Sequence, residues 1–448
     1  MSRVATTSPR AAWVGVAVLV LLVVLAAAIP GLTEWEVRAR SERAGGISVP
    51  PLHGTWQPRW FGPGTLPALA LAVLGWRYGT DLARRLPWRR LLLTAYVAGV
   101  AWLVSLAVTD GGAFGIAHVT GHGYDYGDTA RAVTDVPGLL SGWVPRIDAD
   151  HPENFVTHVA GHPPLALLFF VGLARVGLES DLAMGLAVVV VAASTAPAVL
   201  VALRRLGAED AARRAAPFLV LGPAALFMAV SADAVFGSVA AWGLAALACA
   251  ATSTGRGRLF AWSLLAGLLL GCCVLLSYGL ALLGFLALAV LAAARSWWPM
   301  PIAAAAALVV VLGFAAAGFA WWEAFPSVHE RYWRGLASER PGGYWTWANL
   351  AALGLCGGPA MAAGLGRLAA LRGRADRVVA LLASAAVASV VTATLSQMSR
   401  AEVERIWLPF VPWLTVSVAL LPERWRRWGF GLQVATALLV QHLLYTSW

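Results

Sequence analysis

The side chains most able to take part in chemistry gather in one polar stretch, residues 109–164, of an otherwise apolar chain. Connections much longer than about 15 residues are usually functional or disordered. Five aromatic residues in this stretch, Trp143 among them, favour order. We therefore expect the functional site here. Five of the eight histidines and seven of the 23 acidic residues fall within it, namely His118, His122, His151, His158, His162, Asp110, Asp125, Asp128, Asp135, Asp148, Asp150 and Glu153.

The motif Tyr124–Asp128 (YDYGD) supplies two carboxylates, Asp125 and Asp128, that suit general-base chemistry. A carboxylate that lies just above a bilayer, flanked by aromatic rings and partly desolvated, can accept a proton from a hydroxyl group. The alternative is a solvated turn, because Asp and Gly are common turn residues.

A second motif, Gly161–Leu165 (GHPPL), holds His162 where the chain enters an apolar run. Its two prolines fix the backbone at that point, and a histidine can serve there in binding or proton transfer. The alternative is that His162 only caps the following helix.

Two charged motifs stand at later boundaries between apolar runs. Asp233, in Ser231-Ala232-Asp233, is costly at a membrane boundary unless it faces a polar cavity or a partner, although it could also cap a helix. Glu404 and Arg405 precede the run Ile406–Leu414. The guanidinium of Arg405 could bind a phosphate, or serve only as an interfacial anchor.

Metal-binding patterns are weak. His118 and His122 have a spacing that a metal tolerates, but the HExxH motif is absent and the stretch contains no cysteine, which disfavours zinc. A hard divalent cation, Mg²⁺ or Mn²⁺, held by carboxylates and accompanying a phosphate fits better. All four cysteines lie in apolar runs without CxxC spacing, as expected of small core residues.

The composition indicates a polytopic membrane protein. Of the 448 residues, 59% are hydrophobic and 12% are charged, whereas soluble domains contain about 25% charged residues. All 33 basic residues are arginines and lie mainly between apolar runs, so the net charge of +10 orients the protein in a membrane and does not indicate nucleic-acid binding. The first run, 12–30, is long for a signal peptide, and we interpret it as the first helix.

About thirteen runs approach the length of roughly 20 residues that a membrane span requires. They are 12–30, 64–79, 91–108, 182–203, 215–230, 234–252, 259–277, 279–294, 300–320, 347–367, 378–394, 406–421 and 429–446. With these spans, the arginine-rich connections all lie on the cytoplasmic side, as the positive-inside rule requires. Counting 163–178 as a further span would reverse the later connections, so we predict a re-entrant or surface helix there; the alternative is an ordinary span.

The predicted fold is therefore an all-α transmembrane bundle with a long extracytoplasmic loop. We divide it into residues 1–108, with an outer segment 31–63, a loop region 109–181 and a remaining bundle 182–448. The alternation of spans brings four features to one outer face. They are the 109–164 loop, Ser231–Asp233, the aromatic segment 321–347 and residues 397–405.

These motifs together resemble the GT-C superfamily, integral-membrane glycosyltransferases that use polyprenyl-phosphate sugars. The acidic motif, then HPPL at 162–165 and a later acid at Asp233, are similar to the protein O-mannosyltransferase and aminoarabinose transferase group. The run ERIWLPFVPWL from Glu404 resembles a helix start in actinobacterial polyprenyl-phosphate-dependent mannosyl- and arabinosyltransferases.

The resemblance implies an enzyme that moves a sugar from a polyprenyl-phosphate donor to a glycan, lipid or protein acceptor at the extracytoplasmic face. Asp128, or alternatively Asp125, would deprotonate the acceptor hydroxyl. His162 and Asp233 would orient the substrates, and Arg405 would neutralise the leaving phosphate. Glu404 and Trp143 complete the expected binding residues, and other aromatic residues of the outer face could stack on sugars. They are Trp321, Trp322, Tyr332, Trp333, Tyr344, Trp345 and Trp347.

Two other classes of protein are weighed against this one. Coupled transporters place ionisable residues within their spans, but the predicted spans contain almost none; a lipid or glycolipid flippase fits better. A non-catalytic scaffold of envelope assembly is the other alternative. The arginine-only, alanine-rich composition indicates a high-GC bacterium, so we expect the plasma membrane, a cytoplasmic N-terminus, contact with the lipid bilayer and no nucleic-acid partner.

Overall fold

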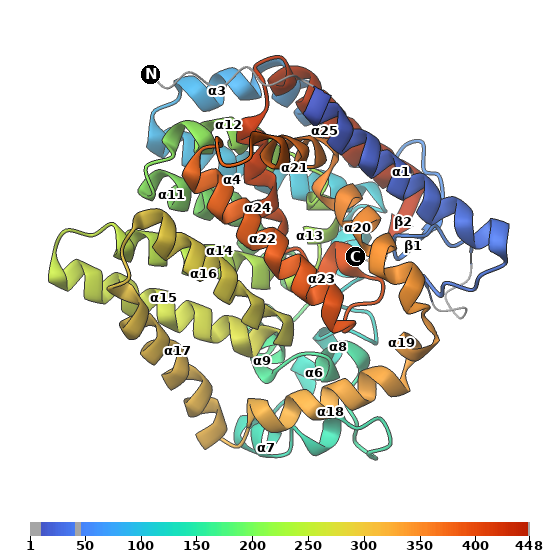
Figure 1. The fold of residues 1–448 in the computed structure, drawn as a ribbon. Coiled ribbons are helices and arrows are strands. Elements are labelled where there is room, and N and C mark those ends of the chain that lie inside the picture. The colour runs from blue at the N-terminus through green and yellow to red at the C-terminus, as the bar shows by residue number, and fades with distance from the viewer. Residues whose placement is uncertain (1–9, 41–45, 447–448) are drawn as a thin grey trace.

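The computed structural model describes residues 10–40 and 46–446 and is almost entirely helical (Figure 1). Within these residues, seven helices are long and apolar enough to cross a membrane, or eight if a bent pair counts as one span. The seven are α1 (Arg10–Thr33), α4 (Trp88–Thr109), the joined pair α10 (Asp181–Ala192) and α11 (Thr195–Arg205), α14 (Ala232–Ala251), α15 (Arg256–Leu276), α17 (Pro299–Ala316) and α22 (Arg377–Ser396). The predicted all-α class is confirmed, and these seven helices fit the predicted membrane protein by their length and composition.

Most of the remaining apolar runs fold into shorter or broken helices, and the last run forms a continuous helix of 19 residues that is not among the seven. The number of about thirteen spans therefore stays a prediction. Proline and glycine cause several of the breaks. The bent pair, α20 (Gly342–Gly357) and α21 (Pro359–Leu371), turns by 113° at Gly358, whose φ of +81° suits glycine. The other pieces are α2 (Thr65–Leu74), α3 (Thr80–Arg85), α12 (Glu209–Val220), α13 (Ala225–Met228), α16 (Leu283–Ala294), α24 (Val411–Thr415) and α25 (Trp425–Leu443).

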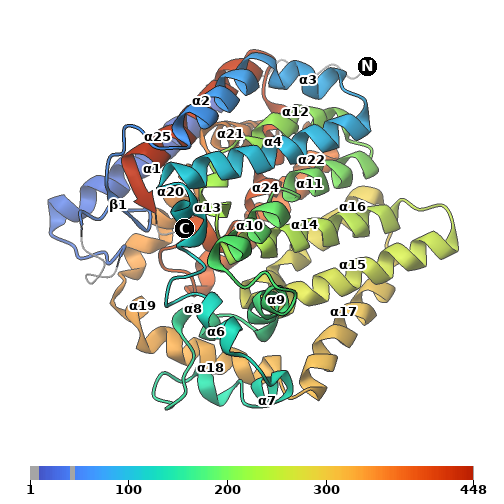
Figure 2. The same ribbon diagram turned by 180° about the vertical axis from the view of Figure 1, so that it is seen from behind.

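The 109–164 stretch folds into short helices. They are α5 (Ala113–Ala117), α6 (Gly127–Ala132), α7 (Val136–Ser141) and α8 (Thr157–Ala160). The amphipathic helix α18 (Trp321–Arg334) lies beside α6, α7 and α8 in both views (Figures 1 and 2), whereas α5 packs on α4 and α10. Arg331 fastens α18 to the loop by donating to the carbonyl oxygens of Ile147 and Phe155, at 2.6 and 2.9 Å. The loop is thus part of the packed structure.

Helix α9 (Pro164–Arg175) follows the two prolines and has 12 residues. At 1.5 Å per residue it is about 18 Å long, too short to cross roughly 30 Å of hydrocarbon. It packs against α6 and α15. This geometry fits the re-entrant or surface helix predicted for residues 163–178.

Three of the arginine-rich connections, at residues 81–90, 204–214 and 424–427, lie together at one end of the bundle. Arg213 donates to the carbonyl oxygens of Ala83 and Leu86, and Arg84 pairs with Glu423. Figures 1 and 2 both show α3, α12 and the start of α25 at this end, with α6, α7, α8 and α18 at the other. The structure therefore separates an arginine-rich end from the end that carries the polar loop.

The outer N-terminal segment joins the C-terminus at the polar end. Strand β1 (Gly54–Trp56) pairs antiparallel with β2 (Leu444–Thr446), and Arg59 donates to the carbonyl oxygen of Thr109 at 3.0 Å. Two further short helices, α19 (Leu336–Glu339) and α23 (Val403–Ile406), contribute to the later part of the chain.

Helix α1 packs closely on α21 through small residues. A Cβ on Gly15 would lie 2.2 Å from the carbonyl oxygen of Ala362, and a Cβ on Gly366 would lie 2.5 Å from that of Ala11. Small residues at both positions let the two backbones approach, as is common between membrane helices. The N-terminal helix is thereby fixed to the C-terminal half of the bundle.

We expect Gly15→Leu to lower the free energy of unfolding by about 1–3 kcal/mol, because the new side chain meets backbone that cannot move aside. Thermal unfolding in detergent measures the change. Gly31→Leu is the matched control, because Gly31 lies on the same helix and a Cβ there meets nothing within 4 Å. Equal effects of the two substitutions would contradict this packing.

Candidate functional site

A buried ion pair lies at the centre of the polar end. Asp233 stands in the first turn of α14, after Ser231, whose hydroxyl oxygen accepts a hydrogen bond from the Asp233 backbone N–H at 3.2 Å. The carboxylate Oδ2 of Asp233 lies 2.5 Å from Nη1 of Arg405 on α23. Both side chains are less than one-tenth exposed. This buried ion pair thus joins α14 to α23, although the two residues are 172 positions apart in the sequence.

Glu402 extends this pair into a network of four charged side chains. It lies 3.5 Å from Arg405 and 2.9 Å from Arg340, and Arg340 also donates to the carbonyl oxygens of Arg38 and Arg400. Burial by itself would raise the pKa of Glu402, but the charges of Arg340, His53 and Arg405 lower it below its ordinary value. Glu402 therefore stays ionised between the two guanidinium groups.

The backbone at Glu402 is strained. Ala401 and Glu402 both have positive φ, 69° and 61°, a region that residues with a Cβ seldom adopt. Two such residues in succession persist only where the surroundings hold them, and they are frequent at functional sites. In this backbone conformation the carboxylate of Glu402 lies beside both Arg340 and Arg405.

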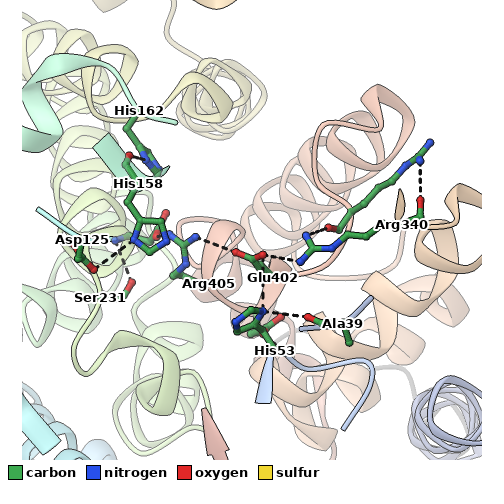
Figure 3. Close-up of polar contacts among 12 residues, drawn as sticks. Ala39, His53, Asp125, His158, His162, Ser231, Arg340, Glu402 and Arg405 are labelled. Carbon is green, nitrogen blue, oxygen red and sulfur yellow. Dashed lines mark hydrogen bonds and ion pairs between the residues drawn. The ribbon is translucent and has the colours of Figure 1, made fainter. Parts of the chain in front are cut away.

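The loop residues Asp125 and His158 lie on the other side of Arg405 (Figure 3). Asp125 is buried, and its Oδ2 lies 3.5 Å from Nδ1 of His158, while its Oδ1 accepts from the Tyr126 backbone N–H at 2.7 Å. The ring of Tyr126 stacks on Phe170 of α9, at a centroid distance of 5.0 Å. Burial raises the pKa of the Tyr126 hydroxyl, and the charges of Asp125 and Asp233 raise it further.

His162 is half-buried beside the same cluster. Its Nδ1 lies 2.9 Å from the carbonyl oxygen of His158, and its ring lies 5.4 Å from that of Phe236 on α14. Burial lowers the pKa of His162, although the charge of Asp233 opposes this. A neutral imidazole, able to donate and accept, is therefore favoured here.

His53 and Glu404 lie at the far side of Glu402. The backbone N–H of His53 donates to Oε1 of Glu404 at 2.7 Å, and His53 Nδ1 lies 3.1 Å from the carbonyl oxygen of Ala39. The other carboxylate oxygen of Glu404 is buried and has no hydrogen-bond partner among the described residues. Burial raises the pKa of Glu404 to about 7 and lowers that of His53 to about 4.

These contacts define what we call the polar cluster: Asp125, His158, His162, Asp233, Arg340, Glu402 and Arg405, with His53 and Glu404 at its edge. Figure 3 shows Arg405 in the middle, with Asp125, His158 and His162 on one side and Glu402, Arg340 and His53 on the other. His158 and Glu402 are each about one-fifth exposed, so the cluster can be approached from solvent. It offers carboxylates, neutral imidazoles and guanidinium groups within one small region.

Asp128 and Trp143, both expected at the site, lie outside the polar cluster. Asp128 is 69% exposed and pairs at 2.6 Å with Arg131, which also pairs with Asp181. Trp143 is fully buried against Phe155, at a ring-centroid distance of 4.5 Å, and therefore cannot stack on a sugar. Both side chains stabilise the loop.

Other predicted aromatic residues also have structural contacts. The Tyr344 hydroxyl donates to the carbonyl oxygen of Ala26, and the Trp345 ring N–H donates to that of Val37. Trp321 stacks on Phe325. These rings fix α20 and α18 in place.

Sequence reasoning did not select four members of the cluster: His53, His158, Arg340 and Glu402. His158 and Glu402 lie in the motif-bearing segments, so their proximity to Asp125 and Arg405 in sequence was a usable signal. His53 and Arg340 carry no local signal, because only the fold brings them to the site.

Among the described residues, no group of three or more His, Cys, Asp or Glu side chains is arranged to hold a metal ion. His118 stacks on Phe114 at a ring-centroid distance of 5.0 Å and bonds to its carbonyl oxygen.

No family model, curated protein or solved structure matches the chain.

The raised pKa of Glu404 predicts a pH dependence of stability. A group whose folded-state pKa exceeds its unfolded value of 4.5 stabilises the fold fully below pH 4.5 and loses that contribution as the pH rises through about 7. Glu404→Gln, which resembles the protonated form, should therefore match the wild type near pH 4.5. Above pH 7 the free energy of unfolding of the variant should exceed that of the wild type by up to about 3 kcal/mol.

Thermal unfolding of both proteins in detergent between pH 4.5 and 8.5 measures this difference. The contribution of His53, which opposes that of Glu404, cancels because both proteins retain this histidine. A difference in stability that is constant across the range would contradict a protonated Glu404.

Proposed function

We propose that this protein is an integral-membrane glycosyltransferase of the GT-C type. In this proposal it moves a sugar from a polyprenyl-phosphate donor to an acceptor hydroxyl group at the extracytoplasmic face of a bacterial plasma membrane. One observation carries the proposal. Asp233 and Arg405, from two of the motifs that resemble this superfamily, form a buried ion pair, and Asp125 from a third motif lies in the same cluster, where the charges of all three act on Tyr126.

The position of the cluster supports the proposed side of the membrane. The arginine-rich connections lie at the opposite end of the bundle, and the positive-inside rule assigns that end to the cytoplasm. A polyprenyl-phosphate donor carries its sugar at the membrane surface, where the loop, α9 and α18 lie in this orientation.

We assign the role of general base to Asp125 rather than Asp128. Asp125 is buried and lies beside His158, whereas Asp128 is exposed and neutralised by Arg131. Asp125 would take the proton of the acceptor hydroxyl group as its oxygen attacks the anomeric carbon. His158, whose Nδ1 lies 3.5 Å from Oδ2 of Asp125, would stabilise the proton that Asp125 accepts.

The bond between the anomeric carbon and the phosphate oxygen breaks in the same step. Its electron pair leaves with the polyprenyl phosphate, which gains one negative charge. Arg405 would face this charge, but Asp233 and Glu402 already hold its guanidinium. In this proposal the two carboxylates therefore position Arg405, and its guanidinium stabilises the charge that develops on the phosphate.

Arg400 is a second cation near the cluster. Among the described residues it pairs with no carboxylate, and its guanidinium lies over the Trp333 ring at 4.5 Å. It reaches the network through Arg340, to whose carbonyl oxygen it donates at 2.8 Å. A cation without a carboxylate partner is suited to binding a phosphate.

A coupled transporter fits the arrangement less well. Transporters place their ion-binding groups near the middle of the membrane. Here Asp233 stands in the first turn of α14, and Arg405 lies on α23, outside the helices long enough to span. The charges are at helix ends, where surface chemistry takes place.

The test is transfer from labelled donors. Membranes that contain the protein are incubated with a panel of labelled polyprenyl-phosphate sugars, and loss of label from the lipid is measured. We expect Asp125→Asn to reduce the rate by about 100-fold or more, because a general base contributes 10²–10⁴-fold. Asp128→Asn should stay near the wild-type rate, because an exposed ion pair contributes little.

Thermal unfolding of each variant separates loss of activity from loss of folding. Wild-type transfer by a folded Asp125→Asn variant would remove Asp125 as the base. Retention of label on every donor by the wild-type protein would overturn the proposed function itself.

A further inference from the structure

A second binding feature lies at the arginine-rich end, far along the bundle from the polar cluster. It is a groove of about 560 Å³ between α1, α25 and the π-helical turn Gly75–Gly79. Four indole rings form most of its wall. The groove is lined by Trp13, Trp76, Arg424, Trp425, Trp428, Gly429, Gly431 and Leu432.

Glycines on α25 create the space. A Cβ on Gly429 would lie 2.7 Å from the Trp425 ring, and one on Gly431 would lie 3.2 Å from Nε1 of Trp76. The indoles therefore rest directly on the α25 backbone. Trp13 packs on Trp425 at a centroid distance of 4.9 Å, which joins α1 to this wall.

The groove stands at the depth of a membrane interface. Trp13 lies in the first turn of the membrane-length helix α1, and Arg424 is the residue just before α25. Trp13 and Trp428 are more than half exposed. Tryptophans at the ends of apolar helices lie at the level of lipid headgroups.

Two arginines border the groove without a carboxylate partner among the described residues. Arg424 lines it, and the guanidinium of Arg427 lies over the Trp76 ring at 4.4 Å. The nearby acid Glu423 pairs instead with Arg84 and Arg426. Positive charge beside an apolar groove is complementary to a ligand with an anionic head and an apolar chain.

We propose that this groove binds an anionic phospholipid. Its acyl chain lies along the indoles and its phosphate lies between Arg424 and Arg427. Basic pockets at the cytoplasmic ends of membrane helices bind anionic lipids in this way. The site is independent of the transferase proposal, because it shares no residue with the polar cluster.

Lipid binding to the full-length protein in detergent tests the proposal. Purified protein is titrated with phosphatidylglycerol and with phosphatidylcholine, and bound lipid is counted by native mass spectrometry. We expect phosphatidylglycerol to bind at least about tenfold more tightly. The double variant Arg424→Gln/Arg427→Gln should lose this preference, and Trp428→Ala should weaken the binding of both lipids.

The matched control is Arg256→Gln/Arg258→Gln, which removes two exposed arginines at the start of α15. It should keep the preference. Equal binding of the two lipids by the wild type would overturn the proposal, and so would a control that loses the preference as fully as the groove variant. If the groove variant does not fold, unchanged lipid binding by Trp428→Ala would overturn it.

Discussion

The ion pair between Asp233 and Arg405 is the interaction on which the polar end depends. Two charges removed from water are stable only when each satisfies the other and their remaining hydrogen-bonding groups are met. Here Glu402 and Arg340 continue the pairing, and Asp125 with His158 adds a second acid and an imidazole. The cluster therefore fixes four separate parts of the chain: the loop, α14, the segment before α20 and α23. Removing one of these charges leaves its partner buried beside one opposite charge fewer.

The rest of the fold holds these charges at one surface. Helix α9, too short to span, and the amphipathic helix α18 leave room for a folded polar loop beside the bundle. Close packing fixes α1 on α21, and the pairing of β1 with β2 joins the segment after α1 to the C-terminal strand at the polar end. The arginine-rich connections collect at the opposite end, where tryptophans and arginines form a groove suited to lipid. The two ends thus have different chemistry, which supports a protein that is oriented in its membrane and works at one face.

Much of this arrangement could be predicted from the sequence. Seven of the apolar runs fold as helices of membrane length. Asp233 and Arg405, which separate sequence motifs predict at the site, form an ion pair, and Asp125 lies in the same cluster. The sequence could not show which of Asp125 and Asp128 is buried. The two lie only three positions apart at the start of α6, and the fold at that point decides which carboxylate faces inward. Nor could it show that Trp143 is buried, since Phe319 from a distant segment covers it. The contacts of His53 with Glu404 and of Arg340 with Arg38 span 351 and 302 residues, so only the complete fold reveals them. The breaks at proline and glycine likewise left the number of spans unresolved.

A double-mutant cycle on Asp233 and Arg405 tests the central interaction most directly. Unfolding in detergent is measured for Asp233→Ala, Arg405→Met and the double variant. Removing one partner of a buried pair leaves an uncompensated charge, so each single substitution should lower the free energy of unfolding by about 3 kcal/mol or more. The double variant should be clearly more stable than the sum of the two losses predicts, because no isolated charge remains. Strictly additive losses would show that the two side chains do not depend on each other, and would contradict the account.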